Sequence, residues 1–185
     1  MRRRAAKAVA ITVSFCALVL ASDPTSIWLD VPFVQQSREG CGAACIAMVM
    51  QYWNGKVGSN NGPDSDAATI LSKLHSPEAH GIYASSMKSY MEEHGYRTFA
   101  VKGTWDDLDQ HLRKGRPLIV ALQPAGNGKI LHYVVVAGID SAKNLVMFND
   151  PAGRKLSKLD RRTFEKEWKA TANWMLLAVP QSPAH

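Results

Sequence analysis

The first third of the sequence contains the run Cys41-Gly42-Ala43-Ala44-Cys45-Ile46-Ala47-Met48-Val49-Met50-Gln51-Tyr52-Trp53. This stretch is rich in helix-forming residues and is apolar around nearly its whole circumference. A helix that is apolar on all sides is usually buried on all sides. We therefore expect residues 41–53 to form the central helix of the domain, with the other elements packed around it.

Length and composition limit the number of domains and the structural class of the chain. The chain has 185 residues, of which 46% are hydrophobic and 21% are charged. This is long enough for one hydrophobic core and short for two domains. The hydrophobic content excludes intrinsic disorder, and no sustained period indicates a coiled coil or a repeat array. We expect one domain over residues 27–180.

The first 22 residues have the layout of a secretory signal. Four basic residues within the first seven positions precede an uncharged run over residues 8–21. The alternative is a retained membrane anchor, but this run is short because spanning a bilayer takes about 20 apolar residues. We expect residues 1–22 to be a signal peptide or an N-terminal membrane anchor. The protein is then exported, either secreted or periplasmic.

Net charge and spacing of polar residues exclude several classes of partner. The formal net charge is +6, and the four basic residues of the N-terminal segment leave +2 for the rest. This small excess gives no reason to expect nucleic-acid binding. No His, Cys and carboxylate spacing matches a metal motif, and no Gly-rich phosphate loop is present. We expect a monomer that needs neither a metal nor another cofactor.

Residue patterns beyond the central helix predict an α+β fold. We expect further helices over residues 66–74, 83–94 and 163–169, and one capped by Thr104 that ends before Gly115. Strands are expected over residues 96–101, 117–122, 132–139, 145–149 and 174–179. Helices come first and a mostly antiparallel sheet follows, which is the α+β arrangement.

Cys41 is the candidate nucleophile. It lies at the first turn of the predicted helix, where unpaired backbone N–H groups and the helix dipole stabilise a thiolate. Cys45 lies one turn further in and lacks this advantage, so we expect it to be a small buried apolar residue.

His132 and Asp150 are the candidate partners of that thiol. His132 opens the most apolar strand, whereas the other five histidines are expected on the surface. The strands over residues 132–139 and 145–149 should form a hairpin, and a turn centred on Ser141 pairs residue 132 with residue 150. Without a bulge, Asp150 then lies opposite His132, or within two residues of it, and can orient the imidazole. Asn149 is the alternative, although it should point to the opposite face.

Gln35 and Gln36 are candidates for an oxyanion donor. They lie six and five residues before Cys41, in the turn that leads to the helix. A side-chain amide there, together with the Cys41 backbone N–H, would provide two donors for the oxygen that becomes negative during attack on a carbonyl.

Three groups of residues together resemble the C39 family of cysteine peptidases. They are Val31-Pro32-Phe33-Val34-Gln35-Gln36 followed by Cys41-Gly42-Ala43-Ala44, then Leu131-His132-Tyr133-Val134-Val135-Val136-Ala137-Gly138-Ile139-Asp140, and finally Asn149-Asp150-Pro151. The similarity extends from about residue 31 to residue 180. Residue 43 is alanine where proline is common in the family.

This resemblance implies a papain-like fold and a catalytic role for each residue. Cys41 would be the nucleophile, His132 the base and then the acid, Asp150 the orienting group, and Gln36 the oxyanion donor, with Gln35 as the alternative. Family members fused to ATP-driven exporters trim leader peptides after a double glycine. Because this sequence carries no transporter domain, we expect a freestanding exported peptidase with another substrate.

The function expected from the sequence is therefore hydrolysis of peptide bonds by a cysteine peptidase. Two alternatives keep the same fold. One is a catalytically silent module that binds peptides or cell-wall fragments, and the other is a thiol acyltransferase or amidase.

Overall fold

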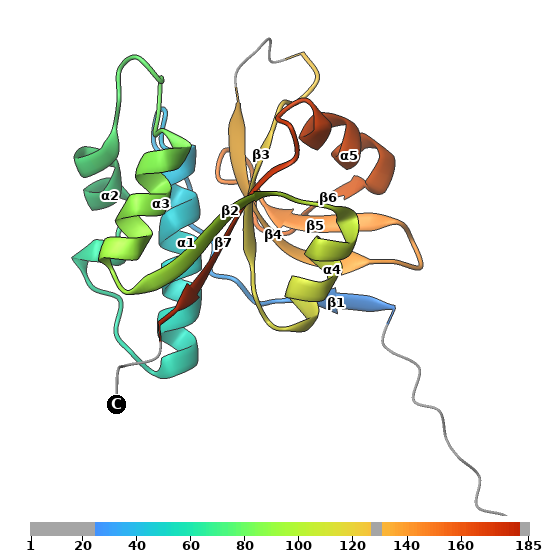
Figure 1. Cartoon of the computed structure of the whole chain (residues 1–185), viewed down its shortest axis with the longest axis horizontal. Helices are drawn as coiled ribbons and strands as arrows, with labels where there is room; N and C mark the ends of the chain where they lie inside the picture. Colours follow the sequence, from blue (N-terminus) through green and yellow to red (C-terminus); the bar gives the residue numbers. More distant parts are fainter. Residues whose placement is uncertain (1–24, 127–130, 182–185) are drawn as a thin grey trace, which may run out of the picture.

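The computed structural model describes residues 25–126 and 131–181 of the chain (Figure 1). The helices are α1 (Cys41–Val57), the short 3-10 helix η1 (Pro63–Ser65), α2 (Ala67–Leu74), α3 (Ala84–Glu93), α4 (Trp105–Arg113) and α5 (Arg161–Lys169). The strands are β1 (Ser26–Trp28), β2 (Tyr96–Lys102), β3 (Leu118–Leu122), β4 (His132–Asp140), β5 (Leu145–Asn149), β6 (Ser157–Asp160) and β7 (Trp174–Pro180).

One antiparallel sheet organises the described part of the chain. Its strands run in the order β2-β7-β3-β4-β5-β6, and β1 pairs with β4. Each neighbouring pair is antiparallel. In Figure 1, α1, α2 and α3 gather on one side of this sheet, whereas α4 and α5 lie on the other. The predicted α+β fold, with helices first and an antiparallel sheet second, is confirmed.

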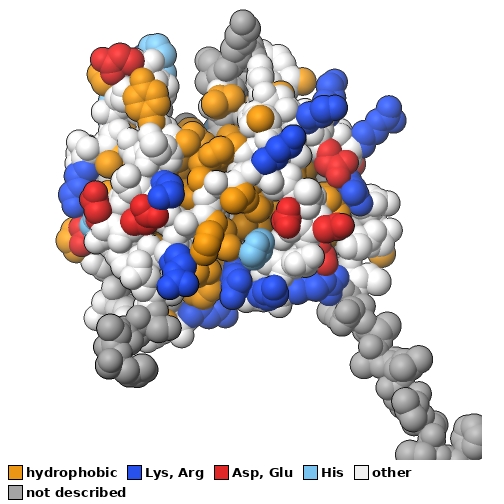
Figure 2. All heavy atoms as spheres, in the orientation of Figure 1, with side chains coloured by type: hydrophobic (Ala, Val, Ile, Leu, Met, Phe, Trp, Pro, Cys, Tyr) orange, Lys and Arg blue, Asp and Glu red, His pale blue; other side chains and the backbone are white. Residues whose placement is uncertain are grey.

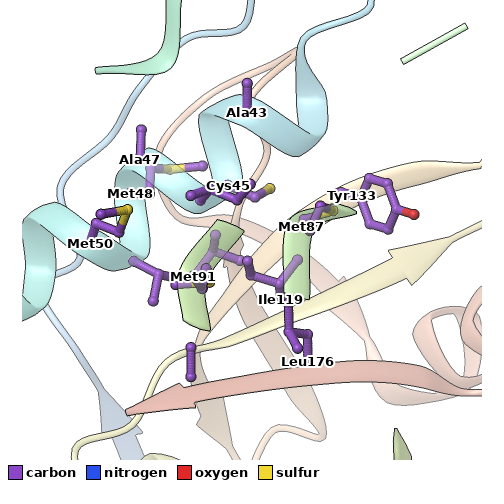
Figure 3. Close-up of a cluster of buried hydrophobic side chains, with 14 of the residues drawn as sticks. Ala43, Cys45, Ala47, Met48, Met50, Met87, Met91, Ile119, Tyr133 and Leu176 are labelled. Atoms are coloured by element: carbon purple, nitrogen blue, oxygen red, sulfur yellow. The ribbon is translucent and has the colours of Figure 1, made fainter. Parts of the chain in front are cut away.

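The two faces of the sheet bury two different cores, because successive side chains of a strand point to opposite faces. Val135 and Ala137 of β4 pack with the helices α1 and α3, while Val134 and Val136 pack with α4 and α5. Figure 3 shows the first core, which is built around α1 and is rich in methionine and alanine.

Helix α1 is the buried centre of the domain, as the sequence predicted. Ten of its residues are buried, and it continues to Val57, four residues beyond the predicted end. Helices α2, α4 and α5 begin at side-chain caps, and the sequence indicated the cap of α4. Asp66 accepts a hydrogen bond from the Thr69 backbone N–H, and Thr104 forms a capping box with Asp107. Such caps satisfy backbone N–H groups that a helix leaves unpaired.

The hairpin of β4 and β5 differs from the predicted register. Asp140 pairs with Leu145, so the loop contains residues 141–144 and is centred after Ala142 rather than at Ser141. The Asp140 carboxylate accepts the Lys143 backbone N–H at 3.0 Å, which stabilises this four-residue loop. A bulge between Val136 and Gly138 then shifts the register by one residue.

Besides β1 and the short helix η1, strand β6 was not predicted from the sequence patterns. Its four residues alternate between half-buried and exposed, and it forms the edge of the sheet beside β5.

The predicted signal or anchor over residues 1–22 lies outside the described residues. Within the part of the chain that is described, no helix has both the length and the apolar character needed to cross a bilayer.

Candidate active site

The turn before α1 determines where the Cys41 thiol lies. Gly40 donates its N–H to Ser37 O at 3.0 Å, and Cys41 is the first residue of the helix. A Cβ atom on residue 40 would approach Ser37 Oγ to 3.0 Å and Ser37 O to 3.1 Å, so any side chain there would crowd the turn and glycine fits it best. Because Gly40 has no side chain to cap the helix, first-turn N–H groups remain free to stabilise an anion.

The surroundings of Cys41 favour its thiolate. Burial is the largest single effect and opposes ionisation, but the hydrogen bond to His132, backbone N–H groups of Tyr133 and Gly42, and the charge of His132 together outweigh it. The pKa of Cys41 therefore lies below its ordinary value. A low thiol pKa in a half-buried site is the property that distinguishes reactive cysteines from structural ones.

His132 contacts both other members of the predicted triad. Its Nε2 lies 2.7 Å from Asp150 Oδ1, which leaves Nδ1 for its hydrogen bond with Cys41. Burial lowers the pKa of His132, but the hydrogen bonds to Asp150 and Cys41 prevail and raise it to about 9. The structure thus brings Cys41, His132 and Asp150 together in one continuous chain of hydrogen bonds.

Asp150 reaches His132 diagonally rather than from the directly opposite position. Asn149 pairs with Val135, so the register places residue 150 opposite residue 134, two residues from His132. The exact pairing of 132 with 150 was wrong because the loop is centred after Ala142, which shifts the pairing by three residues, and the bulge takes back only one of them. The predicted tolerance of two residues includes the observed offset. The hydrogen bond from His132, assisted by the Ala152 and Gly153 backbone N–H groups, lowers the pKa of Asp150.

Gln36 is held next to this triad by its backbone. Its N–H donates to Pro151 O at 2.9 Å, directly after Asp150. The Gln36 Oε1 atom is buried and has no hydrogen-bond partner among the described residues. Gln35, by contrast, is exposed. The geometry therefore favours Gln36 over Gln35 as the amide near Cys41.

Asn149 serves a structural purpose that sequence reasoning missed. Its side chain is fully buried, with Nδ2 donating to Val31 O at 3.1 Å and Pro32 O at 3.3 Å. Its Oδ1 accepts the Leu156 backbone N–H at 3.0 Å. Asn149 thus joins the segment that leads to Gln36 to the end of β5, directly before Asp150, and it lies on the opposite face from His132 as the strand alternation required.

The remaining predicted residues have clear outcomes. Cys45 is fully buried, and burial raises its pKa well above the ordinary value, which confirms it as a small core residue. Of the five histidines expected on the surface, His75 and His80 are exposed, His94 and His111 are partly buried, and His185 lies outside the described residues. His94 stacks on Tyr90 with ring centroids 4.0 Å apart, and His111 has a buried Nδ1 without a described partner.

A second carboxylate and two histidines form a cluster beside the triad. Glu39, two residues before Cys41, binds His75 Nε2 at 2.8 Å and lies 3.6 Å from His80 Nδ1. The hydrogen bond from His75 lowers the pKa of Glu39. No spacing rule indicated this cluster, because residues 75 and 80 belong to a loop whose path is not evident from the sequence.

The family model described as Peptidase_C39 like family matches residues 28–175, so the chain belongs to this family. The transport/processing ATP-binding protein ComA of Streptococcus pneumoniae is 29% identical over 149 residues, covering 80% of this chain and 19% of ComA. The lactococcin-G-processing and transport ATP-binding protein LagD of Lactococcus lactis is 29% identical over 137 residues, covering 72% of this chain and 17% of LagD. The chain thus spans less than a fifth of either relative.

Solved structures show the same fold. A Bacillus anthracis protein described as a C39-like peptidase superimposes with a TM-score of 0.65 at 17% identity, covering 85% of this chain and 98% of that one. The peptidase domain of Streptococcus ComA gives 0.60 at 24% identity, with 80% and 98% covered. A double glycine motif protease from an AMS/PCAT transporter, in complex with the leader peptide, gives 0.60 at 18% identity, with 83% and 94% covered. Family and fold together define the class, a cysteine peptidase with a papain-like C39 domain.

Proposed function

We propose that this protein hydrolyses peptide bonds, with Cys41 as nucleophile, His132 as general base and acid, Asp150 as the group that orients His132, and Gln36 as oxyanion donor. The observation that carries this proposal is the chain of contacts from the Cys41 thiol through His132 to Asp150 Oδ1. These are the parts that thiol catalysis needs, namely an activated sulfur, a base within reach and a group that orients the base.

The reaction proceeds in two halves. The Cys41 thiolate attacks the carbonyl carbon of the scissile bond, and the oxygen that becomes negative is held by the Gln36 amide and the Cys41 backbone N–H. His132 gives its proton to the leaving amine as the C–N bond breaks, which leaves a thioester on Cys41. A water molecule that loses its proton to His132 then attacks the thioester and releases the carboxylic acid, and the thiol returns to its starting state.

Asp150 contributes through the imidazole rather than through the substrate. Its carboxylate accepts the Nε2–H of His132 and so selects the tautomer with the proton on Nε2. Nδ1 is then unprotonated and can accept a proton from Cys41. The same contact stabilises the imidazolium that forms when the thiol ionises. The proposal also places the reaction outside the cytoplasm, because residues 1–22 have the charge and hydrophobic pattern of an export signal.

Selective alkylation tests the activated thiol. Brief exposure of the folded protein to iodoacetamide near neutral pH, followed by peptide mapping, should label Cys41 at least about 10-fold faster than Cys45. The same protein in urea is the control, since unfolding should make the two rates equal. Equal rates in the folded protein would contradict the proposed thiolate.

Cleavage of a mixed peptide library tests the reaction itself. The protein should generate new peptide termini, and the Cys41→Ala variant should lower the rate by about 10⁴-fold or more. The Cys45→Ala variant is the matched control and should retain cleavage. A folded wild-type protein that binds peptides but cuts none would instead favour the binding module.

A further inference from the structure

A cavity of about 460 Å³ opens directly beside the Cys41 thiol. Its walls come from the first turn of α1, from the loop between α2 and α3, and from the start of β4. Its lining includes Cys41, Gly81, Ile82, Tyr83, Leu131 and Tyr133. Cavities that hold ligands have volumes of about 300–1,000 Å³. This one lies at the lower end of that range, which suits one or two side chains of a peptide.

Two large hydrophobic side chains that line this cavity are about half-exposed in the described part of the chain. Tyr83 is 51% exposed and Leu131 is 49% exposed, although hydrophobic side chains of this size are mostly buried elsewhere in the domain. In Figure 2, the loop between α2 and α3 projects at the upper left, with hydrophobic side chains near its tip. Apolar surface that faces a cavity gains free energy when an apolar ligand displaces water from it.

The lining is mostly apolar. Among the described residues that line the cavity there is no Lys, Arg, Asp or Glu, and the ionisable side chains besides the tyrosines are those of Cys41 and His80. Burial raises the pKa of Tyr133 to about 12, so its phenol stays neutral at physiological pH. A charged side chain of a substrate would therefore find no lysine, arginine or carboxylate to pair with in this cavity, and its desolvation would be poorly compensated.

The wall of the cavity is held in place before any ligand binds. The loop between α2 and α3 is closed by the pair of backbone hydrogen bonds between Ser76 and Gly81, at 2.8 and 3.3 Å. Glu39 ties the same loop to the turn before Cys41 through His75 at 2.8 Å. Beneath it, a Cβ on Gly42 would approach Ile82 Cβ to 3.3 Å, so the loop packs closely on α1. A preformed wall loses little entropy on binding.

We infer that this cavity seats a bulky apolar side chain of the substrate, within two residues of the scissile bond. The inference rests on the proposed function, because it takes Cys41 as the atom that attacks. It assigns Tyr83 and Leu131 as residues that determine specificity. It also separates this protein from the solved protease described by a double glycine motif, since glycine would leave the cavity empty.

Four sets of four peptides test this inference, and the peptides within a set are identical except at one position. They carry Leu, Phe, Gly or Glu at the variable position, which is placed in turn at each of the two positions on either side of the scissile bond. At one of these positions, kcat/KM for Leu or Phe should exceed that for Gly and Glu by about 10- to 100-fold. Tyr83→Ala and Leu131→Ala should each lower this ratio about three- to tenfold.

Two further variants sharpen the result. Phe99→Ala is the matched control, because Phe99 is a 45% exposed aromatic residue of β2 that does not line the cavity. It should leave the ratio unchanged. Ala79→Trp fills the cavity from the loop and should reverse the preference toward Gly. Thermal unfolding of each variant shows whether it is folded.

The outcomes separate the two proposals. If the folded protein cuts no peptide, the proposed function fails, and this inference fails with it. If peptides are cut but Gly serves as well as Leu and Phe at each position, only the inference is overturned. Unchanged ratios in Tyr83→Ala and Leu131→Ala would likewise overturn it, since a preference would then arise elsewhere.

Discussion

The first and second turns of α1 carry the same side chain in opposite surroundings. Cys41 meets an imidazole and backbone N–H groups from β4 and α1, and its pKa is lowered even though burial, the largest single effect, opposes ionisation. Cys45 lies among the apolar residues of the core that Figure 3 shows, and burial raises its pKa well above the ordinary value. One turn of helix therefore separates a reactive sulfur from an inert one.

This contrast teaches that burial alone does not decide the chemistry of a cysteine. Both thiols lose hydration, but only Cys41 gains hydrogen bonds that replace water around the anion. The helix supplies some of these donors only at its first turn, because further in each N–H is bonded to a preceding carbonyl. The position at the end of α1 and the approach of β4 are thus both necessary.

Among the substitutions that would make Cys41 resemble Cys45, Asp150→Asn is expected to have the largest effect on activity. An amide can present its N–H group to Nε2 and so favour the tautomer in which Nδ1 carries the proton and cannot accept one from Cys41. We expect kcat/KM to fall by about 10³- to 10⁴-fold, and alkylation of Cys41 to slow toward the rate of Cys45. Asp109→Asn on the surface of α4 is the control and should leave both values unchanged. Loss of less than about 10-fold would exclude Asp150 as the orienting group.

A smaller effect, on stability alone, is expected for Cys45→Ser. The hydroxyl would be buried among apolar side chains without a partner, which costs about 1–3 kcal/mol. Urea denaturation should show this loss in the free energy of unfolding, and Cys45→Ala separates it from the loss of sulfur packing. The rate per folded molecule should stay within about twofold of wild type. A much larger loss of activity would mean that the second turn also takes part in the chemistry.

The smallest expected effect is a dependence of stability on pH. Burial lowers the pKa of His132, but its hydrogen bonds to Asp150 and Cys41 raise it to about 9, above the ordinary value. A raised folded-state pKa gives stability that is fully present below about pH 6.5 and is lost as pH rises through about 9. Urea denaturation at pH 6 and pH 9.5 should show a loss on the order of 1 kcal/mol. The His132→Ala variant should lack that component, and an identical loss in the variant would assign it to other groups.

Local patterns predicted most of the fold. The unbroken apolar run of α1, the cap at Thr104 and the alternation of the strands predicted helices and strands close to those observed. The assignments of Cys41 and His132 to element ends depended on these same local signals, and the structure brings the two side chains into contact. Local residue patterns were sufficient to predict an element wherever the conformation of a segment depends mainly on its own residues.

Features that depend on two distant segments were not predictable in the same way. The hairpin register changed because Asp140 caps a four-residue loop and a bulge follows, and neither has a sequence signal as strong as an Asn-Gly turn. Asn149 was considered only as a partner of His132, because nothing in the local pattern places the carbonyls of Val31 and Pro32 beside it. Strand β6 is short and lies at an edge, where half-burial blurs the alternation.

The position of β7 in the sheet has a consequence for when the enzyme can work. β7 is the last strand of the chain, yet it lies between β2 and β3, and it is the strand with which β2 pairs. As the polypeptide emerges from the ribosome, the sheet therefore cannot close until residues 174–180 have been made. A nascent chain that already carries Cys41, His132 and Asp150 therefore still lacks the strand that joins β2 to the rest of the sheet. The peptidase fold stays incomplete until β7 has been added.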